Sequence, residues 1–227
     1  MVAAAESLTA ETIPPTLAFT RLELEREVVE GCRASAARIG AATLTRLGIT
    51  STMPGEGRST IALGMASLVA RDHCRRTLLI ELDSEQPTLC DRVGLGQVAG
   101  LADLINGEAA LDHCLHPLDQ DLFLLPAGDP SALPERGAAA NAQDVINIVE
   151  QRFDVIVADL PILAGSGAGL LMAELFPTLM LVVRAGVTPL SRVRGAVANL
   201  STPPVVLLNG TTTALPSWVR RIVGDPT

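Results

Sequence analysis

The chain contains no lysine and no tyrosine. Its 17 basic residues are all arginine, and its aromatic residues are four phenylalanines and one tryptophan. Without tyrosine, no residue of this sequence is able to accept a phosphoryl group on a phenol oxygen. Without lysine, an arginine at a position where other proteins carry lysine has two explanations, a chain-wide preference for arginine or selection at that site. Composition does not separate them.

A surplus of positive charge is also missing. The 25 acidic residues outnumber the 17 basic ones, which gives a formal net charge of −8. Proteins that bind nucleic acid without sequence preference neutralise phosphates with a basic surface. The charge balance therefore disfavours nucleic acid as a partner.

Long hydrophobic runs and closely spaced cysteines are absent as well. The longest apolar run, LFPTLMLVVRAGV, is interrupted by Pro177 and Arg184 and is shorter than the roughly 20 residues that span a bilayer. The segment MVAAAESLTAETIPPT has no basic region of the kind that begins a signal peptide, so we expect a cytoplasmic protein. The absence of a Cys-x-x-Cys pair favours free buried thiols over disulfides or a zinc site at the four cysteines, Cys32, Cys74, Cys90 and Cys114.

The sequence does contain a regular alternation of predicted strands and helices. Near-continuous apolar segments predict strands at 44–52, 75–83, 121–128, 153–161, 178–186 and 203–209. Helical patterns lie at 22–42, 59–72, 141–152, 171–177 and 190–200. This order predicts an α/β fold, a single doubly wound and mostly parallel sheet of about seven strands with helices on both faces. We expect a flexible lead over residues 1–20 and one domain over residues 21–227.

A glycine-rich segment, TMPGEGRST, follows the first predicted strand and enters a helix. Gly55 and Gly57 allow backbone amides to face an anion, and the helix directs its positive end at the same point. Ser59 is placed to bind Mg²⁺ and Thr60 to bind a phosphate oxygen. We therefore predict a phosphate-binding loop made by Gly55, Glu56, Gly57, Arg58, Ser59 and Thr60.

Polar residues also follow later strands of the predicted sheet. Glu81 and Asp83 come after the second strand, Asp159 ends a later one, and Asn209 ends the last. We predict catalytic roles for the three acidic residues, metal binding by Asp83 and Asp159 with Ser59, and a contact of Asn209 with a nucleotide base. Each residue alone is an ordinary loop feature. Their recurrence at one edge of the sheet, where such folds bind ligands, favours a nucleotide site.

The motifs together resemble a known family. TSTMPGEGRST is similar to the first phosphate-binding motif, PGEGKS/T, of the bacterial tyrosine kinases of capsule and exopolysaccharide assembly, which belong to the MinD/ParA-like P-loop superfamily. LLIELDSEQP resembles the family's second motif, an Asp-x-Asp after an apolar strand, and FDVIVADLP resembles its third. GLADLINGEAAL, LFLLPAG, LMLVVRAGVTPLSRVRGAV and VVLLNG are similar to other family segments, in the family's order. The resemblance runs from about residue 27 to about residue 223.

This resemblance implies a P-loop NTPase fold with ATP or ADP and Mg²⁺ as cofactors. It also implies a membrane polysaccharide co-polymerase as partner, at the inner face of the membrane, and a homo-oligomer. Several positions depart from the family pattern. Arg58 replaces the lysine of the first motif, Glu81 the first aspartate of the second, and Glu85 a following arginine. Ala36 stands at the last arginine of the family's Glu-x-x-Arg-x-x-Arg helix motif.

Three functions remain open at this point. The first is a degenerate relative of these kinases, with weak or no kinase activity, that binds nucleotide and regulates a membrane polysaccharide co-polymerase. Because the chain lacks tyrosine, autophosphorylation on tyrosine is impossible. The second is an active MinD/ParA-type ATPase, which the absence of a lysine at Thr52 and Met53 disfavours. The third is a structural partner that binds no nucleotide.

Overall fold

Seven strands form one sheet in the order β3-β4-β2-β5-β1-β6-β7. The computed structural model describes residue 24 and residues 26–129, 138–163 and 167–210, so the predicted lead over residues 1–20 lies outside the described part. Neighbouring strands are parallel except β3, which runs antiparallel to β4. The strands are β1 (Arg46–Ser51), β2 (Thr77–Glu81), β3 (His116–Asp119), β4 (Leu122–Leu125), β5 (Val155–Asp159), β6 (Thr178–Arg184) and β7 (Val205–Asn209).

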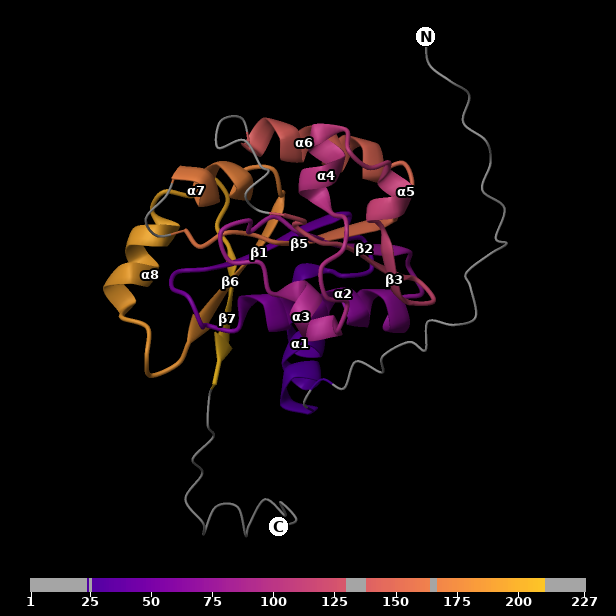
Figure 1. Ribbon diagram of the computed structural model, residues 1–227. Helices are drawn as coiled ribbons and strands as arrows, with labels where there is room; N and C mark the ends of the chain where they lie inside the picture. Colours follow the sequence, from indigo (N-terminus) through magenta and orange to yellow (C-terminus); the bar gives the residue numbers. More distant parts are fainter. Residues whose placement is uncertain (1–23, 25, 130–137, 164–166, 211–227) are drawn as a thin grey trace.

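Helices cover both faces of this sheet (Figure 1). They are α1 (Arg26–Ile39), α2 (Arg58–Asp72), α3 (Leu89–Val93), α4 (Leu101–Asn106), α5 (Leu111–Cys114), α6 (Ala138–Val149), α7 (Gly167–Ala173) and α8 (Leu190–Val197). One hydrophobic core lies between the sheet and α1, α2 and α3, and a second lies between the sheet and α4 to α8. The predicted doubly wound α/β fold is confirmed.

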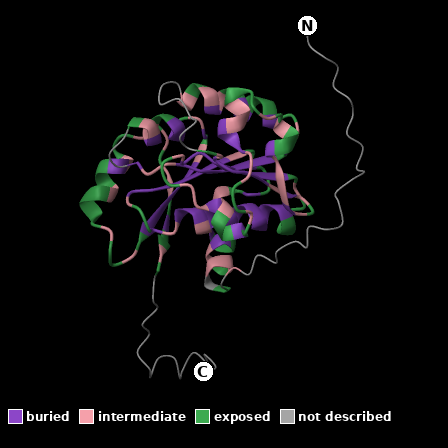
Figure 2. Ribbon diagram, in the orientation of Figure 1, coloured by how far each residue is buried: buried purple, intermediate pink, exposed green. Residues whose placement is uncertain are grey.

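The strands are apolar throughout because both of their faces are covered. All residues of β2 and β5 are buried, and the sheet and α2 form the buried centre in Figure 2. Leu79 of β2 belongs to the core beneath α2, and its neighbour Ile80 belongs to the core beneath α6. Gly64 allows α1 to approach α2 closely, since a Cβ atom there would lie 2.8 Å from the Cys32 Sγ atom.

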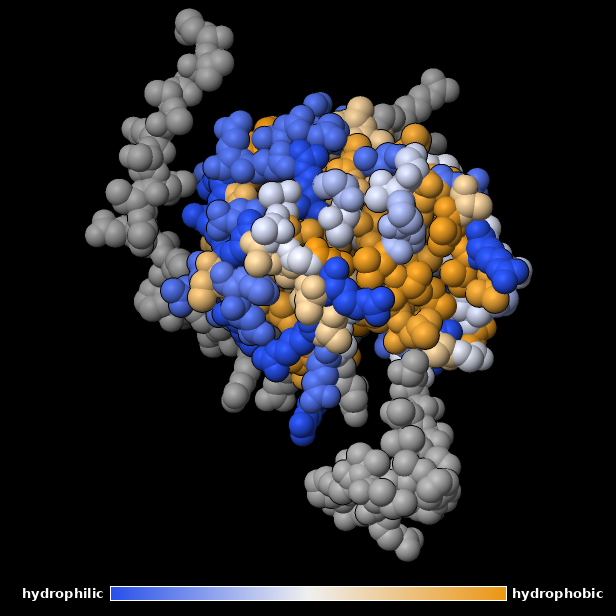
Figure 3. Space-filling view, turned by 180° about the vertical axis from the view of Figure 1, so that it is seen from behind, coloured by the Kyte–Doolittle hydropathy of each residue, from blue (hydrophilic) through white to orange (hydrophobic). Residues whose placement is uncertain are grey.

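The two edges of the sheet differ from its buried centre. On β7, Val206 and Leu208 are exposed, and Val187 and Leu190 near the start of α8 are exposed as well. Figure 3 shows hydrophobic residues gathered on one half of the face that it displays. At the opposite edge, β3 was not predicted, and neither were α3, α4 and α5. These elements have only four to six residues each, too few to show a helical or strand period.

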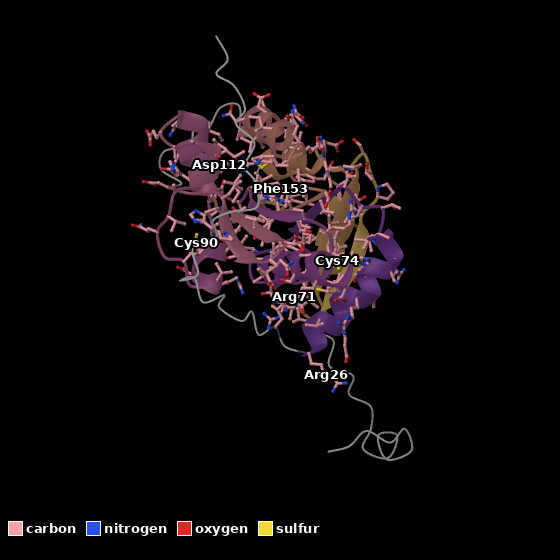
Figure 4. All side chains as sticks on the ribbon, turned by 90° about the vertical axis from the view of Figure 1, so that its right-hand side faces the viewer. Arg26, Arg71, Cys74, Cys90, Asp112 and Phe153 are labelled. Atoms are coloured by element: carbon pink, nitrogen blue, oxygen red, sulfur yellow. The ribbon has the colours of Figure 1, made fainter. Side chains whose placement is uncertain are left out.

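The cysteines of the described chain are free thiols, as predicted, but the prediction that they are buried is wrong for Cys74, which is exposed. Cys32 and Cys114 are buried, and burial raises the pKa of the Cys32 thiol to about 11. Cys74 and Cys90 lie far apart on the molecule (Figure 4). No helix in the described ranges has both the length and the apolar character needed to cross a membrane.

Strand order brings the predicted site residues together. β1 lies between β5 and β6, and β5 also pairs with β2, with Glu81 beside Asp159 in the register. The carboxyl ends of these parallel strands meet at one edge of the sheet, where the glycine-rich loop leaves β1. The fold therefore creates the meeting point that the sequence predicted.

Candidate nucleotide-binding site

The loop between β1 and α2 has the backbone shape that its glycines allow. Gly55 and Gly57 have φ angles of 78° and 92°, a left-handed conformation that is strained for other residues. A Cβ atom at Gly57 would also lie 2.2 Å from the Asn209 Nδ2 atom. The loop ends at Arg58, the first residue of the 15-residue helix α2. Its backbone amides and the positive end of the helix thus meet, as a phosphate site requires.

Asn209 supports this loop from the end of β7. Its Nδ2 atom donates a hydrogen bond to the Glu56 carbonyl oxygen at 2.8 Å, and its Oδ1 atom accepts one from the Gly210 backbone amide at 2.9 Å. Both polar atoms of the side chain are therefore engaged within the chain. The predicted contact of Asn209 with a nucleotide base stays a prediction, and in the structure the side chain holds the loop.

The Glu56 side chain connects the loop to the end of β6 and to the segment that follows it. Its side chain is buried, and one carboxylate oxygen accepts hydrogen bonds from the backbone amides of Thr52 and Met53 and from the Thr52 hydroxyl. The other oxygen accepts from the Arg184 amide and the Thr188 hydroxyl. Burial alone would raise the pKa of Glu56, but these hydrogen bonds outweigh burial and lower it. No sequence pattern indicated that Thr188 and Arg184 contact the loop.

Arg58 points at two of the predicted metal ligands. Its Nε atom lies 2.6 Å from Asp159 Oδ1, and its Nη2 atom lies 2.5 Å from Asp83 Oδ2. The three side chains are 9%, 1% and 7% exposed, in the order Arg58, Asp159, Asp83. The guanidinium therefore binds one oxygen of each carboxylate inside the protein. The sequence predicted that these residues meet, but it predicted a phosphate as the partner of Arg58.

One carboxylate oxygen of this group has no partner. Among the described residues, only Ser67 Oγ and Asp159 Oδ2 are buried side-chain oxygens or nitrogens without a hydrogen bond. Burial raises the pKa of Asp159, although the charge of Arg58 and the Ser59 hydroxyl oppose the shift. Mg²⁺ in phosphate sites is bound by one or two carboxylates together with phosphate oxygens. Asp83, Asp159 and Ser59 have the chemistry to hold Mg²⁺ with ATP or ADP, once Arg58 moves away from the carboxylates.

Glu81 is held by three backbone amides. Its Oε1 atom accepts hydrogen bonds from the backbone amides of Thr88 and Leu89 at 2.6 and 2.8 Å, and its Oε2 atom accepts one from Ala127 at 3.2 Å. Burial raises the pKa of this carboxyl despite those three donors. The predicted catalytic role of Glu81 stays a prediction, and in the structure the carboxylate is engaged by backbone amides. The extra methylene of glutamate lets the side chain reach the start of α3 and the end of β4, where it joins three segments.

Shortening this side chain is expected to destabilise the protein. The substitution Glu81→Asp would withdraw the carboxylate from at least one of its three amide donors, and an unpaired buried amide costs about 1 to 3 kcal/mol. We expect the free energy of unfolding in urea to fall by about that amount. An unchanged free energy of unfolding would show that the three hydrogen bonds contribute nothing to stability.

A second arginine lies beside the loop and was missed from the sequence. The Nη1 atom of Arg92, on α3, lies 2.9 Å from the Thr60 hydroxyl oxygen. Thr60 is the residue that was predicted to bind a phosphate oxygen. Arg92 is exposed, and nothing in its sequence neighbourhood distinguishes it from other surface arginines. The short helix α3, which carries it, was itself not predicted.

Comparison with known proteins identifies relatives of this chain. No family model matches it. The chain is 32% identical over 154 residues to the succinoglycan biosynthesis transport protein ExoP of Rhizobium meliloti, over 65% of this chain and 19% of that protein. It is 30% identical over 121 residues to the tyrosine-protein kinase CpsD of Streptococcus pneumoniae, over 51% of this chain and 52% of that kinase. The chain thus spans about half or less of the length of these two relatives.

Comparison with solved structures finds similar proteins of the same kind. The kinase domain of VpsO matches with a TM-score of 0.71 and 25% identity, over 82% of this chain and 95% of that domain. MinD of Pyrococcus horikoshii, solved with Mg-ADP, matches with a TM-score of 0.58 and 20% identity, over 81% of this chain and 79% of that protein, and shows the fold alone. The chain is therefore a P-loop protein of the MinD/ParA-like fold, related to the bacterial tyrosine kinases of capsule and exopolysaccharide biosynthesis.

Proposed function

We propose that this protein binds the phosphates of ADP or ATP at the loop from Gly55 to Thr60 and acts without kinase chemistry. The observation that carries the proposal is the shape of the loop. Its two left-handed glycines precede a 15-residue helix. The Glu56 side chain connects the loop to Arg184 at the end of β6, and Asn209 at the end of β7 holds the loop backbone. A loop fixed in this way binds phosphate mainly through backbone amides, which do not depend on the side chain at position 58.

The absence of kinase chemistry is supported by three features of the chain. Arg58, at the position of the family lysine, is bound to Asp83 and Asp159. Glu81, at the position of a family aspartate, is bound to backbone amides. Phosphoryl transfer depends on the positioning of such groups, and displacement of them is poorly tolerated. The chain also has no tyrosine to phosphorylate.

For the biological role, we propose a regulatory partner of a membrane polysaccharide co-polymerase, acting at the cytoplasmic face of the membrane. The support is sequence similarity to ExoP, a succinoglycan biosynthesis transport protein, and to CpsD, a tyrosine-protein kinase. A protein that binds nucleotide without transferring phosphate is able to report nucleotide state through conformation. Binding of the purified chain to the cytoplasmic segment of a co-polymerase from the same genome, with and without ADP, tests this role.

Calorimetric titration with ADP and ATP tests nucleotide binding directly. We expect both to bind, and we expect no phosphoryl transfer to a tyrosine-bearing partner. Gly57→Ala is the matched loop variant, since its Cβ atom would collide with Asn209, and it should lose binding. Steady release of phosphate from ATP that disappears in Asp159→Asn would identify a MinD/ParA-type ATPase instead. Failure of both nucleotides to bind at millimolar concentration would identify a structural partner.

A further inference from the structure

The two carboxylates at the phosphate loop are almost fully engaged by the protein itself. Arg58 takes Asp159 Oδ1 and Asp83 Oδ2. The backbone amides of Glu85 and Gln86 each donate to Asp83 Oδ1 at 3.2 Å. Of the four carboxylate oxygens, only Asp159 Oδ2 has no partner. A divalent cation that needs both carboxylates must therefore displace the guanidinium.

Displacement of Arg58 separates a buried ion pair. A buried guanidinium that loses its carboxylate partners is left as an uncompensated charge, which is strongly unfavourable. Mg²⁺ prefers a near-octahedral set of oxygen ligands at about 2.0 to 2.1 Å, and loses its waters reluctantly. To form that set here, it must also leave Arg58 without Asp83 and Asp159, its two charged partners among the described residues. Arg58 thus competes with Mg²⁺ for the same oxygens.

Positive charge for a phosphate is available at this loop without a metal. The loop leads into the N-terminus of α2, which has no side-chain cap within the described part of the chain, so the positive end of the helix is available to a phosphate. Arg92 adds a second guanidinium, which the Thr60 hydroxyl holds beside the loop. Neither group contacts Asp83 or Asp159 in the structure, so neither is neutralised by them.

We propose that Arg58 takes the place of the divalent metal at this loop, so that nucleotide binds here without depending on Mg²⁺. The inference rests on the proposed nucleotide binding and specifies its cofactor. Arginine suits this role because it offers a separate nitrogen to each carboxylate, whereas the single ammonium group of lysine would have to serve both. The substitution Arg58→Lys should therefore release the carboxylates more readily and make binding dependent on Mg²⁺.

Calorimetric titration of ADP in excess EDTA and in millimolar MgCl₂ tests this proposal. For the natural chain, we expect the two dissociation constants to agree within about threefold; for Arg58→Lys, we expect Mg²⁺ to tighten binding by about tenfold or more. Arg71→Lys is the matched control, since Arg71 lies on the same helix and pairs with Asp119 at 2.7 Å, far from the loop. It should behave as the natural chain. Tenfold tighter binding with Mg²⁺ in the natural chain, or metal independence of Arg58→Lys, would overturn the proposal.

A second measurement separates this proposal from nucleotide binding itself. Electron paramagnetic resonance of Mn²⁺ alone, without nucleotide, reports whether the carboxylates are open to a cation. We expect Mn²⁺ to bind Arg58→Lys at least about tenfold more tightly than the natural chain. If no nucleotide binds to any variant, the proposed function fails, while Mn²⁺ still decides the role of Arg58. Equal Mn²⁺ affinity in both proteins would show that Arg58 does not compete with the metal. Circular dichroism establishes that each variant is folded.

Discussion

Replacing Arg58 with methionine is expected to lower the free energy of unfolding by about 3 to 5 kcal/mol at neutral pH. Methionine keeps most of the apolar side chain but removes the cation between Asp83 and Asp159. Both carboxylates would then be buried next to each other without a counter-charge, and like charges at short range disfavour each other's ionisation. Urea denaturation at pH 7 measures the loss. Arg71→Met removes an ion pair with Asp119 in which the arginine side chain is half exposed, and it should lower the free energy of unfolding by about 1 kcal/mol or less.

The loss from Arg58→Met should depend on pH. Burial already raises the pKa of Asp159 above its ordinary value of 3.8, and removal of Arg58 takes away the charge that opposes this shift. A carboxyl whose pKa is higher in the folded than in the unfolded state destabilises the protein when ionised. This penalty shrinks as pH falls through the folded pKa and is gone below the unfolded pKa. The deficit of the variant should therefore shrink as the pH falls from 7 towards 4. The triple variant Arg58→Met, Asp83→Asn, Asp159→Asn should recover stability at pH 7. A deficit that is the same at both pH values would show that unpaired carboxylates are not its cause.

The location of the site was predictable because it depends only on strand order and glycine spacing. Parallel strands end at one edge of the sheet, so residues that follow β1, β2, β5 and β7 must meet there. Gly55, Asp83 and Asp159 met as predicted, and the fold class followed from buried strands alternating with helices. Strand order and glycine spacing follow from short-range sequence patterns, so they are predictable without knowing where any particular side chain points.

The partners of the long side chains were not predictable in the same way. Glu81 turns to the amide of Ala127, 46 positions later in the sequence, because the end of β4 lies beside β2 in the sheet. Arg58 was expected to face a phosphate, but it reaches two carboxylates that are 25 and 101 positions away. The spacing of residues in the sequence predicts which Cα atoms lie at this edge of the sheet. The partner of a long, flexible side chain depends on which charged groups and amides the complete fold places near it.

Glu56→Gln is expected to cost about 2 to 4 kcal/mol and to abolish nucleotide binding. Five donors converge on the Glu56 carboxylate, and glutamine offers them one oxygen while its amide group places a donor against the others. Hydrogen bonds to a charged group are worth about 1.5 to 3 kcal/mol, and buried donors left unpaired add to the loss. Without this anchor, the loop is no longer held to the end of β6. Glu30→Gln, which removes an exposed pair with Arg26, should change the free energy of unfolding by less than about 1 kcal/mol.

The pH dependence of Glu56→Gln should differ from that of Arg58→Met. Hydrogen bonds lower the pKa of Glu56 below its ordinary value of 4.5, so its contribution to stability is complete above that value and is lost only as pH falls through the lower, folded pKa. The deficit of Glu56→Gln should therefore stay constant as the pH falls from 7 to about 5, whereas the deficit of Arg58→Met should shrink as the pH falls, because the pKa of Asp159 is shifted upwards. Urea denaturation of both variants at several pH values in this range compares the two. If the deficit of Glu56→Gln also shrinks above pH 5, the Glu56 carboxylate is not stabilised by its five donors, and the loop must be held in shape by other contacts.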